Sequence, residues 1–308
     1  MAESPSPAST PARKDAPAAA PPTKERAGKP DLATLSGIIL ALAGIIGGLL
    51  LEKGSIQDVA QATAAMIVFG GTIGAVLITN PLPVFLRGCK ALGQVFFERN
   101  VSPASTIQTI LQMATKARKN GIVSLESEAE QLPDPFLSKA LNLAVDGTDL
   151  NELRKMMETD IELAEQAGEA EAKVWEAAGG YAPTIGIIGA VMGLIQVMKH
   201  LEDIKEVGHG IAVAFVATVY GVGSANIFFL PAANKLRARL HRMRVIKEMA
   251  LEGVSAIVEG LNPTLIRLKL EAFDQEKTAP RKAKGSQTPK PSEASSKAGT
   301  PQPVSAGD

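Results

Sequence analysis

Hydrophobic and polar residues are strongly segregated along this chain. Residues 32–51, LATLSGIILALAGIIGGLLL, contain no charged side chain. At about 1.5 Å of rise per residue, such a helix spans a hydrocarbon core about 30 Å thick. Three further uncharged runs cover residues 59–79, 179–198 and 211–233. Soluble core helices rarely reach this length without a charge, so the pattern predicts four membrane-spanning helices.

The polar segment between the second and third runs follows helical spacing. Ser102 is a plausible N-cap, with a proline after it as the first helical residue, and Gly121 suits the end of that helix. LPDPF (residues 132–136) predicts a turn, and Asp149 is placed to cap the next helix. From Leu150 the chain is helical and charged, and this helix is expected to continue into the third span.

A last helix follows the fourth span, closed by Gly260 and Pro263. One face of it carries Leu236, Leu240, Met243, Ala250, Val254 and Ile257. No segment alternates with the period of two that marks a strand. The predicted fold class is therefore all-α: an integral membrane protein with four transmembrane helices and a helical cytoplasmic domain.

Six segments are expected from these patterns. They are a disordered tail (1–30), transmembrane helices 1 and 2 (31–79), a cytoplasmic helical domain (80–178), transmembrane helices 3 and 4 (179–233), a cytoplasmic helix (234–272) and a second disordered tail (273–308). The tails are rich in Pro, Ala, Ser and Lys, and cannot bury enough apolar surface to offset the entropy of ordering.

Charge refines this organisation. The chain carries 32 basic and 32 acidic residues, which argues against nucleic acid as a partner. Lys and Arg gather before the first run, after the second and after the fourth, so both termini and the long central loop are expected in the cytoplasm. The basic segment after the fourth run could also bind anionic membrane lipid. A single cysteine, Cys89, excludes a disulfide within the chain.

None of the four runs contains Asp, Glu, Lys, Arg or His. Membrane proteins that carry protons usually place an ionisable group at depth. The third and fourth runs offer hydroxyls and amides instead: Thr184, Gln196, Thr218, Tyr220, Ser224 and Asn226. Either another chain supplies the missing carboxylate to an ion path, or these polar groups bond across helices within the bundle. The pattern does not decide between the two.

Two prolines and several glycines interrupt the apolar runs. Pro183 and Pro231 each remove a backbone donor, so each marks a helix-end kink or, together, a pair of hinges at one depth. Glycines recur at a spacing of four at Gly44 and Gly48, Gly70 and Gly74, and Gly189 and Gly193. Such spacing lets helix backbones approach closely. We also expect the glycines of the third run to let a partner helix slide past.

These motifs resemble one known family. APTIGIIGAVMGL in the third run, VATVYGVGSANIFFLPAANKL through the fourth, and ARKNGIVSLE, PFL and VDGTD in the loop are similar to the MotA family of flagellar stator proteins. This family lies in the wider MotA/TolQ/ExbB group, and the resemblance covers residues 32–270. Four spans with a large loop between the second and third match MotA better than TolQ or ExbB, which have three.

The resemblance implies a function and an assembly. A pentamer of this chain would surround a dimer of a MotB-like single-span partner, whose aspartate binds the ion. Ion flow through the bacterial inner membrane would then turn the pentamer against the flagellar rotor. That partner would explain why the runs lack a carboxylate.

The resemblance also assigns residues to roles. It places Pro183, Ala190, Thr218 and Pro231 along the ion pathway, with alanine at position 190 typical of proton-driven members. It places Arg118 and Glu126 at the contact with the rotor. Both loop charges also have a local explanation, because Arg118 lies in the last turn of a helix and Glu126 would follow a cap at Ser124, where each favours the helix dipole.

Two alternatives stay open at this point. One is a TolQ/ExbB-like energiser of envelope processes, and the other is a passive membrane scaffold. An enzyme is not expected, because the sequence shows no nucleophile–base pair, metal-ligand cluster or phosphate loop. No cofactor and no metal site are predicted.

Overall fold

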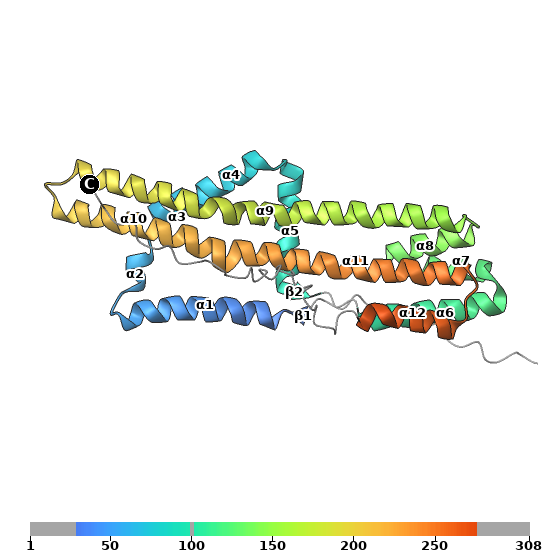
Figure 1. Ribbon diagram of the computed structural model, residues 1–308. Helices are drawn as coiled ribbons and strands as arrows, with labels where there is room; N and C mark the ends of the chain where they lie inside the picture. Colours follow the sequence, from blue (N-terminus) through green and yellow to red (C-terminus); the bar gives the residue numbers. More distant parts are fainter. Residues whose placement is uncertain (1–28, 99–101, 276–308) are drawn as a thin grey trace, which may run out of the picture.

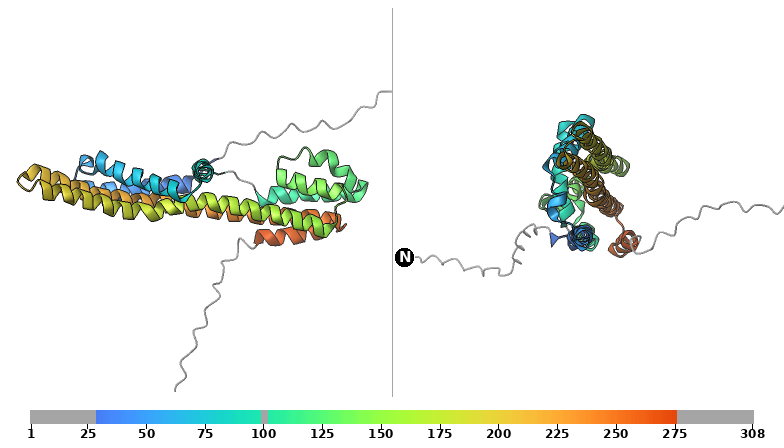
Figure 2. Two further views of the ribbon diagram at one scale, coloured as in Figure 1. Left: turned by 90° about the horizontal axis from the view of Figure 1, so that it is seen from above. Right: turned by 90° about the vertical axis from the view of Figure 1, so that its left-hand side faces the viewer.

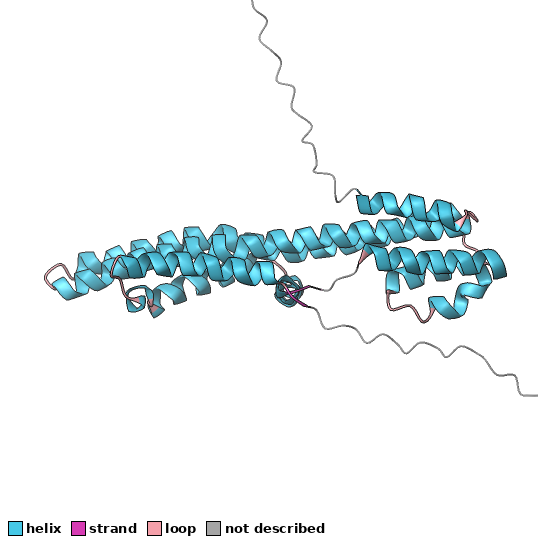
Figure 3. Ribbon diagram, turned by 90° about the horizontal axis from the view of Figure 1, so that it is seen from below, coloured by secondary structure: helices cyan, strands magenta, loops and turns pink. Residues whose placement is uncertain are grey.

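The molecule is built around two long helical rods. A computed structural model describes residues 29–98 and 102–275. One rod is α9 (Leu150–Lys199), and the other is α10 (Ile204–Ser224) joined to α11 (Leu230–Val258) through a π-helical turn, η3 (Ala225–Phe229). The rods run side by side along an elongated molecule (Figure 1), and its described part is almost entirely helical (Figure 3).

The other elements attach to these rods. In chain order they are β1 (Lys29–Pro30), α1 (Leu32–Leu51), α2 (Ile56–Val59), α3 (Ala62–Ala65), η1 (Met66–Gly70), α4 (Gly71–Thr79), α5 (Leu82–Phe96), β2 (Phe97–Glu98), α6 (Pro103–Asn120), η2 (Ile122–Leu125), α7 (Glu126–Ala129), α8 (Pro135–Val145) and α12 (Pro263–Gln275).

Four stretches of the described chain are long and apolar enough to cross a membrane: Leu32–Leu51, Ile56–Thr79, Leu150–Lys199 and Ile204–Val258. The prediction of an all-α protein with four membrane-spanning helices is confirmed. The last two stretches are longer than a bilayer requires, because α9 and α11 continue into the polar end of the molecule. The expected continuation of the helix from Leu150 into the third span is therefore confirmed.

The second span is not the single helix that its sequence predicts. A capping box at Ser55 and Asp58 starts α2, and the helix breaks at Ala60 and Gln61 before α3 begins. A π-helical turn, η1, follows directly and leads into α4. Neither proline nor glycine lies at the break, so its cause is a contact from another helix, described below.

Helix α1 has no buried residue and is fixed at its base. The Asp31 carboxylate accepts hydrogen bonds from the first amides of α1. The backbone N–H of Asp31 donates to the Phe96 carbonyl at 2.9 Å. Lys235 forms an ion pair with the same carboxylate, and Arg239 lies 3.5 Å from it. Lys235 is the main reason that the pKa of Asp31 falls from 3.8 to about 2.

A short antiparallel pairing completes this anchor. Lys29 faces Glu98 and Pro30 faces Phe97, so β1 lies against β2 at the end of α5. The sequence analysis expected no strand here and placed Lys29 and Pro30 in a disordered tail, and the structure corrects both points. Residues 1–28 and 276–308, where the rest of the two predicted tails falls, lie outside the described residues. Helix α12 reaches Gln275, past the boundary expected after residue 272.

Helix α5, which the sequence analysis did not predict, crosses the rods steeply and is seen nearly end-on in Figure 2. Gly88 lets it approach α9, because a β-carbon there would lie 3.3 Å from the Glu171 carbonyl oxygen. The Trp175 indole N–H donates to the Gly88 carbonyl at 2.9 Å. Phe96, Phe228 and Phe229 gather around this contact, with Trp175 stacked on Phe229. The contact thus joins α5, α9 and η3.

The polar end forms a distal domain from α6, η2, α7, α8 and α12, packed on the ends of α9 and α11. Its fully buried side chains are Ile110, Leu125, Leu141, Leu153, Met157, Met249, Val254, Ile266 and Leu270. Some of these residues precede the third membrane span in the sequence, and the others follow the fourth. The buried core of the domain therefore forms only when α9 and α11 lie side by side. Helix α12 contributes the last two and was not predicted.

Most local predictions in this domain hold. Helix α6 begins at Pro103 and ends before Gly121, whose φ of 81° is a left-handed conformation. Ser102 precedes the helix but makes no side-chain capping bond. The Asp149 carboxylate caps α9, as expected. Of the residues expected on one face of α11, Met243 is 51% exposed, whereas the others are buried or half-buried.

The Asp31 anchor yields a testable prediction. Asp31→Asn keeps a capping oxygen but removes the negative charge that Lys235 and Arg239 share, so amides at the base of α1 should lose protection from hydrogen exchange. Asp203→Asn is the matched control, because Asp203 caps α10 in the same way without an ion pair to another described residue. Equal protection in Asp31→Asn and the native protein would contradict the anchor.

The pH dependence follows from the lowered pKa of Asp31. A depressed carboxyl pKa stabilises the folded state at pH values above its ordinary 3.8, and this contribution is lost as pH falls towards about 2. Protection of the α1 base in the native protein should therefore be constant from neutral pH to about pH 4, and fall below it. The Asn variant should lack this acidic transition.

Candidate functional site

Three of the four predicted pathway residues lie where α9 packs against α10. Glycines make this contact unusually close. A β-carbon on Gly221 would lie 2.5 Å from the Ala182 carbonyl oxygen, and one on Gly186 would lie 2.9 Å from the Ala217 carbonyl oxygen. Real β-carbons do not approach backbone atoms so closely, so only glycine fits at these two positions.

This contact brings three of the four pathway residues into one region. Pro183 follows Ala182, which touches Gly221, and lies within the continuous helix α9. The Thr218 Cα would lie 3.5 Å from a β-carbon on Gly186. Ala190 follows Gly189, which faces Ala217. Pro183, Ala190 and Thr218 are all partly buried, so the region remains partly accessible.

Pro231, the fourth residue, lies farther along the rod. It is exposed at the start of α11, directly after η3. Its neighbour Leu230 packs on Gly179 of α9. A π-helical turn before a proline rearranges the backbone bonds that the missing N–H would disturb. The sequence analysis expected a kink at this point and did not predict the π-helical turn.

The glycines of the third span have a different role from the expected one. We expected them to give a partner helix a smooth surface, but Gly186, Gly189 and Gly193 are all buried against α10. In contrast, a β-carbon at Gly44, Gly48, Gly70 or Gly74 would meet no atom of the described chain within 4 Å. Any second chain must therefore reach α9 through its exposed apolar face, which includes Ile187, Ile188, Val191 and Ile195.

Most polar groups of the spans bond to their own helix. The Thr218 hydroxyl donates to the Ala214 carbonyl at 3.2 Å, and the Asn226 amide donates to the Val222 carbonyl at 2.9 Å. Thr184 and Ser224 also donate to carbonyls of their own helices. Of the two alternatives that the sequence left open, bonding across helices does not hold for these four side chains. Because Thr218 donates its only proton to the backbone, its oxygen keeps acceptor capacity.

Tyr220 is the exception and explains the break in the second span. Its hydroxyl donates to the Val59 carbonyl and accepts a bond from the Gln61 backbone N–H at 3.3 Å. Its ring stacks on Phe69 with centroids 6.0 Å apart. The phenol therefore satisfies backbone groups on both sides of Ala60, where the helix stops. The sequence analysis noted the hydroxyl but gave it no role.

Sequence reasoning also missed Thr72. This residue is 1% exposed, and its hydroxyl donates to the Val68 carbonyl at 2.6 Å. Val68 lies inside the π-helical turn η1, where backbone bonding departs from the α pattern. The Thr72 hydroxyl therefore bonds a carbonyl of the π-helical turn η1, which is the second departure of this span from a regular α-helix. A threonine inside an apolar run was the only sequence signal for it.

The two predicted loop charges are exposed in the distal domain. Arg118 lies in the last turn of α6, and Glu126 begins α7. Neither side chain makes a hydrogen bond or ion pair to another described residue, whereas nearby Lys116 pairs with Glu128 at 2.5 Å. The expected cap at Ser124 is wrong, because its hydroxyl donates to the Gly121 carbonyl instead. Arg118 and Glu126 are thus available for an outside partner.

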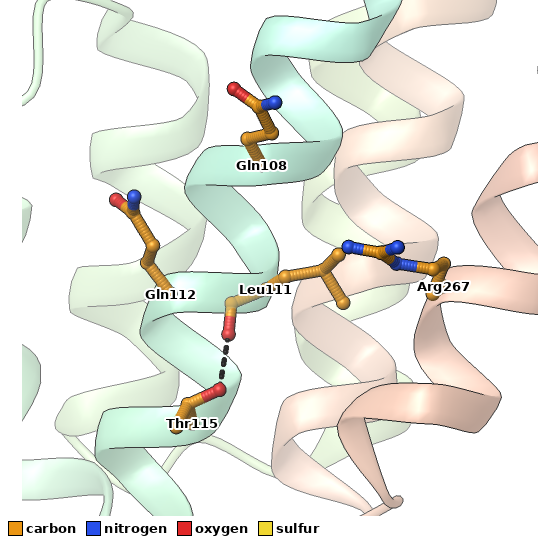
Figure 4. Close-up of a pocket in the computed structure, with 5 residues that line it drawn as sticks. All are labelled: Gln108, Leu111, Gln112, Thr115 and Arg267. Carbon is orange, nitrogen blue, oxygen red and sulfur yellow. Dashed lines mark hydrogen bonds between the residues drawn. The ribbon is translucent and has the colours of Figure 1, made fainter.

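Two shallow depressions mark the surface of the distal domain. The first, of about 430 Å³, lies between α6 and α12, and Figure 4 shows Arg267 extended over Leu111 at its edge. Gln108, Gln112 and Thr115 complete its lining, and it contains no predicted site residue. The second, of about 340 Å³, includes Arg118. Within the described residues, no cluster of His, Cys, Asp and Glu could hold a metal ion.

Ion pairs join the two rods between the spans and the distal domain. Arg237 of α11 bonds Glu169 at 3.0 Å and Glu176 at 3.0 Å on α9. Farther along, the Arg154 guanidinium of α9 bonds the Glu259 carboxylate at 3.2 Å. Each exposed pair contributes at most about 1 kcal/mol, so the series mainly fixes the relative position of the rods.

Tyr220→Phe tests the role of the phenol in the second span. The variant keeps the ring on Phe69 but loses the bonds at Val59 and Gln61, so unfolding should become easier by about 1 kcal/mol. Amide exchange at Gln61 and in α3 should accelerate. Tyr181→Phe is the matched control, because the Tyr181 hydroxyl bonds only the Thr79 side chain at an exposed position. Unchanged exchange at Gln61 in Tyr220→Phe would contradict the assigned contact.

Comparison with known proteins identifies the family. The model of the MotA/TolQ/ExbB proton channel family matches residues 128–249, and that of the motility protein A N-terminal segment matches residues 35–121. Motility protein A of Bacillus subtilis is 36% identical over 244 residues, covering 78% of this chain and 89% of that protein.

Two solved structures share the fold. The structure of C. jejuni MotAB matches with a TM-score of 0.76 and 31% identity, covering 79% of this chain and 95% of the other. The flagellar MotAB stator complex from Bacillus subtilis matches with a TM-score of 0.73 and 34% identity, covering 80% of this chain and 100% of the other. By sequence and by fold, this chain belongs to the motility protein A branch of the MotA/TolQ/ExbB proton channel family.

Proposed function

We propose that this chain is a stator subunit of the bacterial flagellar motor. With a MotB-like partner it forms an ion channel and converts ion flow into rotation. The observation that carries the proposal is the match to two MotAB complexes over about four-fifths of this chain, at 31% and 34% identity. The lack of any ionisable side chain in the four apolar runs supports it, because the partner must then supply the titrating group.

The partner is a single-span protein that carries an aspartate in its membrane helix. A pentamer of this chain surrounds two copies of it. The exposed apolar faces of α1 and α9 support an assembly in the membrane, because both need lipid or protein neighbours. We propose the inner membrane as its location, with both termini in the cytoplasm, as the distribution of Lys and Arg indicates.

Pro183, Ala190, Thr218 and Pro231 line the ion path in this proposal. The acceptor oxygen of Thr218 lies beside the glycine contact, partly accessible to a neighbouring helix. Ala190 offers only a methyl group, which cannot replace the oxygen ligands that a sodium ion requires. The transported ion is therefore the proton, which needs only the partner's carboxylate and a chain of acceptors.

The distal domain meets the cytoplasmic rotor. Arg118 and Glu126 make that contact, and their exposure without partners in the described chain supports the assignment. In this proposal residues 80–178 and 234–272 lie on the cytoplasmic side, and α12 extends that side to Gln275. We propose no catalytic role, because the family is a channel family and not a known class of enzyme.

An envelope energiser of the TolQ/ExbB type is the second candidate, since the broader family includes such proteins. The match of residues 35–121 to the motility protein A N-terminal segment favours the flagellar stator. A passive scaffold has no observation in its favour.

A swimming assay tests the function and the ion together. Cells that lack this chain should not swim, and its return should restore swimming. Restored swimming should persist without sodium and stop when a proton uncoupler is added, because Ala190 gives sodium no ligand. Normal swimming of cells without the chain would refute the stator function. A strict sodium requirement would refute only the assignment of the proton.

Pro183→Ala tests the hinge assigned to α9. The alanine restores an N–H that can bond the Gly179 carbonyl, which stiffens this turn. Swimming should weaken while co-purification with the MotB-like partner is unchanged. Pro263→Ala is the control. Pro263 is the first residue of α12, where a backbone N–H would have no partner within the helix, so its replacement adds no helical hydrogen bond. If Pro183→Ala swims as well as this control, the proline has no hinge role.

A further inference from the structure

Helix α5 lies at the level where the four apolar spans of the described chain end. It starts shortly after α4, and the Phe96 carbonyl at its other end accepts a hydrogen bond from the Asp31 N–H at the base of α1. Trp175, which precedes the third apolar run, donates its indole N–H to α5, and Phe96 stacks on Phe228 near the end of the fourth run. Helix α5 therefore marks the boundary between the apolar spans and the polar part of the chain.

This helix lies across the spans rather than along them. Figure 1 shows α5 crossing α9 and α11, and Figure 2 shows it nearly end-on. Because the spans run through the bilayer, a helix that crosses them at their ends lies along the membrane surface. Tryptophan is enriched at that surface, where its apolar ring and its polar N–H each find a suitable environment, and Trp175 is the only tryptophan of the chain.

The outer face of α5 carries leucines and cations. Its inner face packs on the rods, in a buried cluster with residues of α9 and α11. On the outer face, Leu82 is 60% exposed and Leu86 is 52% exposed, and Arg87 and Lys90 are exposed beside them. At about 100° of rotation per residue, the two cations lie between these leucines and the buried face. A helix of this kind places its apolar side chains at the acyl boundary and its long cations among the headgroups.

No acid of the described chain neutralises these two cations. Neither Arg87 nor Lys90 forms an ion pair or a side-chain hydrogen bond with a described residue. Glu171, whose backbone carbonyl lies beside Gly88 of α5, pairs with neither. The sequence also allowed lipid contact at the basic segment after the fourth run, but most cations of that segment are engaged within the chain. Lys235 pairs with Asp31, Arg237 with Glu169 and Glu176, and Arg244 with Glu165.

We propose that the outer face of α5 binds an anionic phospholipid of the leaflet next to the distal domain. Leu82 and Leu86 contact the acyl chains, and Arg87 and Lys90 bind the headgroup phosphate. A guanidinium can bond two phosphate oxygens at once, and an ammonium adds a compact charge. A phosphatidylcholine headgroup carries its own cation, so the site selects lipids with a net negative charge. This inference needs only that the spans lie in a bilayer, and it stands apart from the stator function.

Trp175 reports on the site directly, because its indole N–H donates to the Gly88 carbonyl of α5 at 2.9 Å. The full chain is reconstituted in phosphatidylcholine vesicles with equal fractions of brominated phosphatidylglycerol or brominated phosphatidylcholine, since bromine quenches a nearby tryptophan. Phosphatidylglycerol should associate about fivefold more strongly, the ratio expected for one cation at an anionic surface. This preference should fall at about 1 M salt, where charges are screened beyond about 3 Å. Equal quenching by the two lipids would overturn the proposal.

Variants assign the preference to the two cations. Arg87→Gln combined with Lys90→Gln should remove it, and Arg87→Lys should keep most of it. Lys199→Gln combined with Lys205→Gln is the matched control, because these two exposed lysines lie at the other end of the spans. The control should keep the full preference, and Trp175 emission in detergent should be the same in all variants. A preference that survives in the Arg87 and Lys90 double variant would contradict the site.

Two further outcomes identify what covers α5. Inorganic phosphate added to the vesicles should not relieve the quenching by brominated phosphatidylglycerol, because the acyl chains hold the headgroup at the helix. Displacement of the lipid by free phosphate would show a soluble anion site instead and overturn the proposal. If neither brominated lipid quenches Trp175, another protein chain covers α5, and the lipid site is wrong.

Discussion

The close backbone contact between α9 and α10 is the constraint on which the rest of the structure depends. At Gly186 and Gly221 the two helices approach so closely that no side chain fits between them. In a membrane, where lipid is as apolar as the side chains, such packing is a main source of helix association. The contact brings Ala182 against Gly221 and Gly186 against Thr218, so it sets the relative direction of the two rods.

From that contact, the rods connect the spans to the distal domain as one body. Helix α9 continues without a break for 50 residues, and α11 follows it through the ion pairs of Arg237 and Arg154. The distal core closes between the ends of these rods, because Leu153 and Met249 from the two rods join the same buried cluster. A bend at Pro183 would therefore be transmitted to the tip that carries Arg118.

Local patterns predicted the parts of the fold that local forces determine. The four apolar runs and the α6 boundaries at Pro103 and Gly121 needed only composition, caps and glycine. The break at Ala60, the β1–β2 pairing and the depression beside Arg118 could not be predicted, because each depends on residues far apart in sequence. Tyr220 lies more than 150 positions from the backbone that it bonds. Periodicity along one segment contains no information about such contacts.

The central claim is that this chain shapes an ion path but carries no titrating group in it. Proton flux into liposomes tests this claim most directly, measured with a pH-sensitive dye for the purified chain alone and for its complex with the MotB-like partner. The complex should conduct protons, and a complex whose partner lacks the membrane aspartate should not. Proton flux into liposomes that contain the chain alone should equal the flux into empty liposomes. Sustained proton flux through the chain alone would contradict the account.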